Sequence, residues 1–343
     1  MLDLDRSENL AQSTAEIGRR MIMLEACAFC GSRDLTPMPF VNDLEPMDEV
    51  GEALKDSDYH LCNACALLFA RRRQSRETVA DYYGWFSQLE HRDYAVYPPP
   101  ESYRAAKRLV AAYHLERLEA LSLIGAASTI GHIRCDFGSL HQAIAAKYPQ
   151  ATVYGWDYFD SNIRYAREQG IDNVGTLAPA SIVLPPGQRY DLLLANHIFT
   201  HALSPQDDLR ILHDGLARDG VLYIYNEADH LLRFSPGTRE FLWAPLNNFH
   251  KQLFSSQSLI YFLIRGGFEI LTFGRRGHYM ELAARSVDAT GDAHAHALDE
   301  ARRRAAAAVP EMAANFARWR RIQKSPLKGM RKVAGKVRRR LAG

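Results

Sequence analysis

The stretch from Thr129 to Asp160 decides the fold and reads TIGHIRCDFGSLHQAIAAKYPQATVYGWDYFD. An apolar-rich run ends at Gly138, apolar residues then recur at helical spacing up to Pro149, and a second apolar run closes on Asp157. This pattern predicts a strand, a helix and a second strand. A unit this compact favours parallel strands joined by a right-handed crossover, and the ligands of such sheets bind beyond the carboxyl ends of the strands.

Acidic residues stand at both of these strand ends. Asp136 and Gly138 follow the first strand, and Asp157 ends the second. A carboxylate at the end of the second strand can accept hydrogen bonds from both hydroxyls of a ribose, as an adenosine-containing cofactor requires. We therefore predict that Asp136, Gly138 and Asp157 bind a cofactor. The alternative for Asp157 is an acid that caps the helix following it.

Helices and strands continue to alternate after this unit. Helices are expected at 161–169, 207–217 and 255–265, strands at 173–177, 190–196 and 220–226, and a hairpin at 268–273 with 278–284. Five strands alternating with helices, with an antiparallel pair closing one edge, are typical of a doubly wound α/β sheet with one reversed strand. We place this Rossmann-like domain at residues 125–288.

The composition is that of an ordinary globular protein. The 343 residues suffice for one large or two smaller domains, and 47% of them are hydrophobic. No run approaches 18 apolar residues, so no membrane span is expected. The first residues, MLDLDRSENLAQ, have neither a basic start nor an apolar core, so we expect no signal peptide and a cytoplasmic location.

Four of the five cysteines form two pairs, Cys27 with Cys30 and Cys62 with Cys65. Each C-x2-C turn can point two thiolates at one ion, and two such turns give a closed tetrahedral site with a structural role. The spacing predicts a zinc ribbon over residues 24–72, preceded by a lead-in at 1–23; a redox or disulfide use and chance spacing are the alternatives. The fifth, Cys135, is expected to be a buried, small apolar residue.

A helical connector is expected at 73–124, ending in an amphipathic helix at 101–124 that docks on the sheet. Its first part is rich in aromatic residues, which could form a lid over a cofactor or pack between the ribbon and the main domain. These residues are Tyr82, Tyr83, Trp85, Phe86, Tyr94 and Tyr97.

The C-terminal segment, residues 289–343, is basic and expected to be helical or disordered. Residues 290–343 carry 14 Lys and Arg against 4 Asp and Glu. Apolar residues including Trp319 and Ile322 are interleaved with the basic ones, which favours contact with an anionic membrane surface over contact with nucleic-acid phosphates. The alternative is a solvated tail without a partner. The membrane hypothesis would make the protein peripheral to the inner membrane.

Several stretches together resemble the class I S-adenosylmethionine-dependent methyltransferases, and in particular a bacterial branch with an N-terminal zinc ribbon, often linked to sugar or natural-product modification. The matching stretches are CAFCGSRDL, LCNACALLFA, RYDLLLANHIFTHALSP, LARDGVLYIYNE and FHKQLFSSQSLIYFLIRGGFEI, within residues 25–285. The resemblance implies a seven-stranded methyltransferase sheet, S-adenosylmethionine as cofactor, and methyl transfer to a small hydroxylated acceptor.

The glycine-rich turn of that family reads roughly D-x-G-x-G-x-G, whereas this chain has only Gly138 in the turn and a segment about four residues shorter. The acid expected after the third strand is absent, since residues 175–179 read GTLAP. The alternative function is therefore a catalytically silent methyltransferase-fold protein that acts as a scaffold or binds a protein partner.

Three histidines are the candidate catalytic residues. His197 and His201 follow the fourth strand, four residues apart, so one helical turn would place both beside the cofactor. A histidine with a pKa near 6.5 is a suitable base for the acceptor's proton. As metal ligands this pair lacks a third partner. His250, in the stretch FHKQLF, matches a position that faces the active site in the family that the chain resembles.

Overall fold

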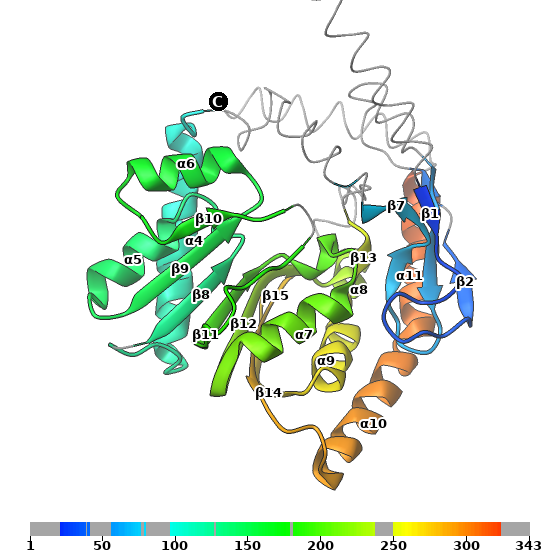
Figure 1. Ribbon diagram of the computed structural model, residues 1–343. Helices are drawn as coiled ribbons and strands as arrows, with labels where there is room; N and C mark the ends of the chain where they lie inside the picture. The colour runs from blue at the N-terminus through cyan, green and yellow to red at the C-terminus, as the bar shows by residue number, and fades with distance from the viewer. Residues whose placement is uncertain are drawn as a thin grey trace, which may run out of the picture.

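The computed structural model describes residues 21–38, 40–41, 56–76, 79, 97–126, 128–178, 181–236 and 250–323. A seven-stranded sheet forms its centre, in the order β10-β9-β8-β11-β12-β15-β14 (Figure 1). Neighbouring strands run parallel except that β15 is antiparallel to both β12 and β14. The predicted doubly wound sheet with one reversed strand is confirmed. Its strands are β8 (Thr129–Ile133), β9 (Thr152–Asp157), β10 (Val174–Thr176), β11 (Tyr190–Asn196), β12 (Leu216–Ala228), β14 (Phe268–Arg276) and β15 (Tyr279–Ser286).

Helices cover both faces of this sheet because alternate residues of its strands point to opposite sides. On β11, Leu192 and Leu194 pack with α4 (Glu101–Ala120) and α5 (Ser139–Lys147). Leu193, between them, packs with α7 (Pro205–Gly215) and α9 (Ser256–Arg265) on the other face. The helix α6 (Asp160–Glu168) packs beside β10. The expected docking helix is thus present as α4, and its Leu109 is 75% exposed.

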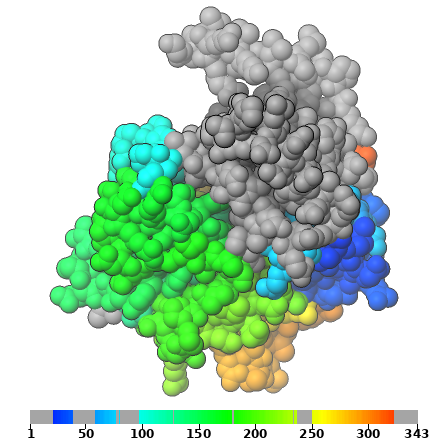
Figure 2. Space-filling view, turned by 45° about the horizontal axis from the view of Figure 1, so that its top comes forward, coloured from blue at the N-terminus to red at the C-terminus, as the bar shows by residue number. Residues whose placement is uncertain are grey.

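The N-terminal region forms a small antiparallel sheet that includes a strand from the main domain. Its order is β13-β6-β5-β2, so β13 (Gln252–Leu253) pairs with β6 (Leu68–Ala70), although the two are far apart in the sequence. The other two strands are β5 (Tyr59–Cys62) and β2 (Leu35–Pro37). Two further antiparallel pairs are β1 (Met21–Met23) with β7 (Arg72–Gln74), and β3 (Phe40–Val41) with β4 (Asp56–Ser57). In the space-filling view the blue surface of this region adjoins the sheet domain (Figure 2).

The C-terminal helices return to the body of the protein. Ala301 and Ala305 of α10 (Asp292–Ala307) are buried in the core that includes α9. In α11 (Val309–Gln323), Trp319 is 2% exposed, and its ring centroid lies 5.2 Å from that of Phe234. The expectation that Trp319 serves a membrane surface is therefore wrong, because its indole packs against the small sheet and α8 (His230–Arg233).

Three sequence predictions fall partly or wholly outside the described residues: most of the lead-in, the aromatic segment except Tyr97, and the tail after Gln323. Among the described helices, none is both long and apolar enough to cross a membrane.

Candidate functional site

The carboxyl ends of β8, β11 and β12 carry an unusual backbone. Four non-glycine residues there have positive φ angles: Arg134 (57°), Asp136 (52°), His197 (51°) and Asn226 (62°). Such conformations cost energy and persist where the surrounding structure enforces them, often at ligand sites. Here Arg134 Nη1 donates to the carbonyl of His197 at 2.5 Å, and Asn226 Nδ2 donates to Oδ1 of Asn196 at 2.9 Å. The strand ends are thus tied to one another in a fixed, strained arrangement.

Asp157 lies at the end of β9, as expected, but its carboxylate is bound to the chain itself. Its oxygens accept hydrogen bonds from the backbone N–H groups of Asp136 and Phe159 and from Nδ2 of Asn162, each at 3.0 Å. The side chain is buried, and burial together with Asp136 raises its pKa. In this arrangement Asp157 ties the loop after β8 to the start of α6, although the N-cap residue of α6 is Phe159 and not Asp157.

Asp136 and Gly138 occupy the turn between β8 and α5. Asp136 forms an ion pair with Lys107 of α4, with 2.6 Å between Nζ and Oδ2. Gly138 precedes the first residue of α5 at φ +84°, and a Cβ there would lie 2.3 Å from Cδ1 of Ile171. The positive φ therefore favours glycine at this position, and a larger residue would also have to displace the Ile171 side chain.

The cavity that the described residues leave at this edge is small, about 30 Å³. This is room for a water molecule, whereas pockets for drug-sized ligands measure roughly 300–1,000 Å³. Leu140 lines the cavity, and the ring of His141 occupies the space beside Gly155, where a Cβ would lie 2.5 Å from its Cε1. Polar residues that line the cavity include Lys107, His114, His132, Asp136, Asn196 and Tyr225.

The three candidate histidines lie together. Ring centroids are separated by 4.8 Å between His197 and His201, 5.4 Å between His197 and His250, and 5.1 Å between His201 and His250. His197 directly follows β11, His201 ends the 3₁₀ turn η1 (Phe199–His201), and His250 precedes β13. From the sequence, His197 and His201 lack a third metal partner, and the position of His250 in the structure corrects this.

A buried acid supports this histidine cluster. Glu227 accepts hydrogen bonds from the backbone N–H of Phe199 at 2.8 Å and from Oγ1 of Thr200 at 2.5 Å, and its Oε2 lies 3.7 Å from Nδ1 of His197. Burial raises the pKa of Glu227. Burial, with a contribution from Arg134, lowers the pKa of His201 well below 6.5, so its imidazole is neutral at physiological pH.

Lys251 is a buried basic residue that the sequence analysis did not single out. It is 0% exposed, and its Nζ has no hydrogen-bond partner within the described part of the chain. Burial, with a smaller effect of Arg73, lowers its pKa to about 7. The sequence gives little sign of this burial, because a lysine is ordinarily expected in solvent. In the structure Lys251 is buried together with its neighbours Gln252 and Leu253.

The four predicted cysteine ligands also converge. The Sγ atoms of Cys27 and Cys65 are 3.7 Å apart, and those of Cys30 and Cys62 are 3.4 Å apart. Sulfurs bound to one tetrahedral zinc at about 2.3 Å would be separated by roughly 3.8 Å. The four side chains therefore fit a zinc ion, and Cys135 is buried elsewhere, in a small apolar cluster, as expected.

The first cysteine turn is docked on the sheet domain through Phe29. Its ring lies edge-on to both Tyr261 and Phe262 of α9, with centroid distances of 5.1 Å. Its carbonyl accepts hydrogen bonds from Gln206 Nε2 and, at 3.2 Å, from Arg265 Nη1. The cysteine site thus joins the small sheet to α7 and α9.

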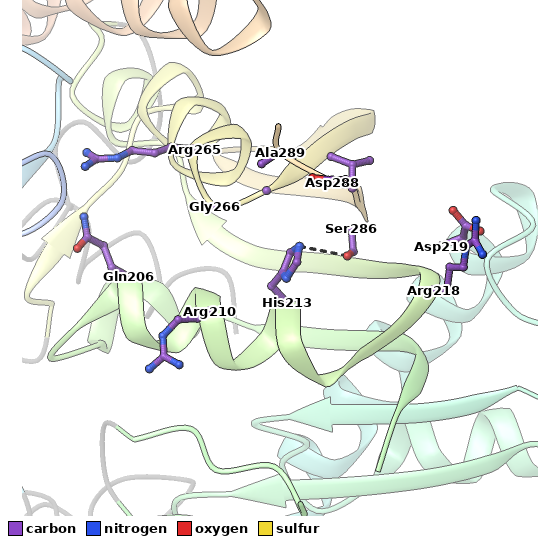
Figure 3. A pocket seen from close by; sticks show the side chains of 12 residues that line it. Gln206, Arg210, His213, Arg218, Asp219, Arg265, Gly266, Ser286, Asp288 and Ala289 are labelled. Atoms are coloured by element: carbon purple, nitrogen blue, oxygen red, sulfur yellow. Dashed lines mark hydrogen bonds between the residues drawn. The ribbon is translucent and has the colours of Figure 1, made fainter. Parts of the chain in front are cut away.

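A wide depression of about 890 Å³ lies at the opposite end of the sheet (Figure 3). It is bordered by the ends of α7 and α9 and by the end of β15, and His213 is hydrogen-bonded to Ser286 at 3.2 Å across it. The strained strand ends, the histidine cluster and the cysteines take no part in its lining, so we do not regard it as the candidate site.

No family model and no curated protein matches the chain. Solved structures that resemble it include an O-methyltransferase family protein from Burkholderia thailandensis, with 16% identity over 62% of this chain and 72% of that one and a TM-score of 0.42. A magnesium protoporphyrin IX methyltransferase from Synechocystis, with bound SAH, has 18% identity over 62% and 100% of the two chains and a TM-score of 0.42. An S-adenosylmethionine-dependent methyltransferase from Clostridium acetobutylicum has 10% identity over 61% and 98%, with a TM-score of 0.40. These similarities are too low to indicate an activity, and the fold is identified from the strand order of the sheet.

Proposed function

We propose that this chain transfers a methyl group from S-adenosylmethionine to a small hydroxylated acceptor, such as a sugar or a natural-product intermediate. One observation carries the proposal: the carboxyl edge of the doubly wound sheet combines the acids Asp136 and Asp157 with a cluster of three histidines. In folds of this type the ligand lies at that edge. The sequence resemblance to class I methyltransferases points to the same edge.

The donor set at this edge fits the amino-acid end of the cofactor. Asp136 and Lys107 offer one negative and one positive group, which complement an ammonium and a carboxylate. Nδ1 of His132 and Nε2 of His114 are buried without a hydrogen-bond partner in the described part of the chain, and both residues line the small cavity. The adenosyl end requires the edge to open, because the cavity there measures only about 30 Å³. The carboxylate of Asp157 also already accepts hydrogen bonds from three protein groups.

When bound, the cofactor supplies an activated methyl group, and the protein contributes mainly alignment. Nδ1 of His197 faces the carbonyl oxygen of Asn226 at 2.9 Å, so the tautomer that donates this proton carries no proton on Nε2, the basic nitrogen of the ring. We propose His197 as the base for the acceptor hydroxyl, with His201 and His250 beside it. Glu227 orients His197 and the turn that carries His201.

The proposal also covers the peripheral parts of the chain. Zinc at the four cysteines would have a structural role, since all four positions are filled by protein ligands. Thiolates reserved for metal rather than disulfides favour a cytoplasmic location. The basic residues after Gln323 would contact an anionic membrane surface, without help from Trp319.

The test is calorimetric titration of the zinc-loaded protein with S-adenosylhomocysteine. We expect binding that is lost in Asp157→Ala and weakened in Asp136→Asn, which removes the charge that faces Lys107. Asp172→Ala, at an exposed position away from the edge, is the matched control. Because Asp157 is buried and its loss could unfold the edge, Asp136→Asn is the variant that decides.

A second candidate function, a catalytically silent scaffold, is favoured by the closed edge. The cavity of about 30 Å³ and the three hydrogen bonds that the carboxylate of Asp157 accepts from the protein are what a site without a cofactor would show. The absence of heat and of thermal stabilisation at millimolar S-adenosylhomocysteine would favour this candidate and contradict methyl transfer.

A further inference from the structure

We propose that His197, His201 and His250 form a second metal site, separate from the four cysteines, for a divalent transition-metal ion such as Zn²⁺. One ligand atom from each ring lies within 4.8 Å of the other two. Zinc binds imidazole nitrogen at 2.0–2.1 Å, so nitrogens around one tetrahedral ion lie about 3.3 Å apart. Rotations about the side-chain bonds are enough to close the cluster on an ion.

The surroundings of His197 are those of a metal ligand. A metal-bound histidine usually donates its second ring N–H to a carboxylate or a backbone carbonyl, which fixes the ring and its tautomer. Nδ1 of His197 has such a partner in the carbonyl oxygen of Asn226 at 2.9 Å, and Oε2 of Glu227 lies nearby at 3.7 Å. The same Glu227 carboxylate binds the η1 turn through Phe199 and Thr200, so one buried acid orients two of the three ligands.

His201 provides an independent observation. Its side chain is 8% exposed, and its Nδ1 is buried without a hydrogen-bond partner among the residues that the structure describes. Leaving a buried polar atom without a partner costs roughly 1–3 kcal/mol. Its ring faces the other two histidines at centroid distances of 4.8 Å and 5.1 Å. An ion at the centre of the cluster would supply the missing interaction.

The small N-terminal sheet holds His250 and the turn that carries His201 in place. Tyr59 of β5 donates a hydrogen bond to the carbonyl of His250. The backbone N–H of Lys251 donates to the carbonyl of Thr200 at 2.8 Å, and Nε2 of Gln252 donates to that of Ala202 at 2.8 Å. The segment that carries His250 is therefore bound directly to the turn that carries His201, and the two ligands are held near each other by the protein itself.

Three imidazoles without a carboxylate ligand suit Zn²⁺, Cu²⁺, Ni²⁺ or Fe²⁺ rather than Mg²⁺ or Ca²⁺. Three protein ligands leave a fourth position open, as in catalytic zinc sites. Arg134 and Lys251 lie near His201, and Glu227 offsets part of their positive charge. We therefore expect weaker binding than at the four cysteines, so that a mild chelator strips the histidine site first.

The open position gives the site a role in the reaction. An acceptor hydroxyl bound there would lose its proton more easily, because a bound cation lowers the pKa of an oxygen ligand. The ion would then replace His197 as the activator of the acceptor. This role rests on the proposed methyl transfer, whereas metal binding by the three histidines does not.

The test is a titration of the full-length chain, with zinc already at the cysteines, with Co²⁺ in a calorimeter and a spectrophotometer. We expect one further equivalent to bind, with a visible spectrum that lacks thiolate-to-cobalt charge-transfer bands. His201→Ala and His250→Ala should lose it, and Glu227→Gln should weaken it by about 10–100-fold. His213→Ala, outside the cluster, should retain it. S-adenosylhomocysteine is absent throughout, so the result is independent of cofactor binding.

Two results would overturn the proposal. One is a wild-type protein that binds no Co²⁺ beyond the cysteine site. The other is a double variant, His201→Ala with His250→Ala, that binds the second equivalent with unchanged affinity. His250 is only half-buried, so His250→Ala decides if the variant at the buried His201 does not fold.

Discussion

The carboxyl group of Asp208 should make the stability of the protein depend on pH. Asp208 is on α7 and 7% exposed. Burial raises its pKa from 3.8 to about 7, and a hydrogen bond from the backbone of Ile182 opposes this shift only in part. The folded protein therefore binds a proton that the unfolded chain releases, and the ionised carboxylate destabilises the native state at alkaline pH.

The size of the effect follows from the two pKa values. A difference of about 3 pKa units corresponds to roughly 4 kcal/mol of lost stability once both states are ionised, above pH 7. As the pH falls through 7 the folded protein takes up the proton and the penalty shrinks, and it vanishes below about pH 4. Between pH 8.5 and 5.5 the penalty should fall by roughly 2 kcal/mol.

Asp208→Asn removes the titrating group while keeping the shape of the side chain. In urea unfolding followed by tryptophan fluorescence, the variant should be more stable than wild type at pH 8.5, and its advantage should shrink by roughly 2 kcal/mol at pH 5.5. Asp207→Asn is the matched control, since the side chain of Asp207 is 59% exposed and hydrated in both states. An advantage of Asp208→Asn that stays constant across this pH range would refute the reasoning.

Three further predictions concern the docked and terminal parts of the chain. Phe29→Ala should lower the free energy of unfolding by about 3–5 kcal/mol, because a buried ring between two aromatic rings is lost. A chelator should then extract the cysteine-bound metal faster from the variant, and an unchanged extraction rate would contradict the docking of the cysteine turn through Phe29. Trp319→Ala should cost about 3–5 kcal/mol in urea unfolding, whereas a loss under about 1 kcal/mol would show that α11 is not anchored there. Deletion of residues 324–343 should abolish sedimentation with anionic vesicles, since each basic residue near the surface contributes about 1 kcal/mol; vesicle binding by the truncated chain would assign the contact to another surface.

The sheet was predictable because its strands correspond to local runs of apolar residues in the sequence. Residues 192–195, LLLA, are an uninterrupted apolar run, which is typical of a strand buried on both faces, and β11 has the predicted bounds Tyr190–Asn196. The fifth strand was placed at 220–226, whereas β12 spans Leu216–Ala228. Asp219 and Gly220 are residue types common in turns, but Asp219 adopts a φ of 61° and the strand continues through it. These turn residues therefore do not mark the start of the strand, because pairing within the sheet extends β12 across them.

The site was predictable only in part, because its groups come together through the tertiary structure. His250 is 49 positions after His201, and no local pattern shows that β13 brings it to the η1 turn. Asp157 was placed at the correct strand end, but the three donors that occupy its carboxylate come from two loops and α6. The burial of Trp319 could not be predicted from its basic neighbours. Basic residues can keep their charged ends in solvent while an apolar residue beside them packs against another part of the protein.

The pairing of β13 with β6 sets an order of events during synthesis. Residues 27–65 contain all four predicted cysteine ligands and are made before β13, so metal can be captured before that strand is synthesised. The small sheet, however, lacks its edge partner until Leu253 has been translated. At roughly 5–20 residues per second, the delay after Ala70 is roughly 10–40 s. During this interval the nascent ribbon exposes an unpaired strand edge, a target for chaperones or for a neighbouring nascent chain.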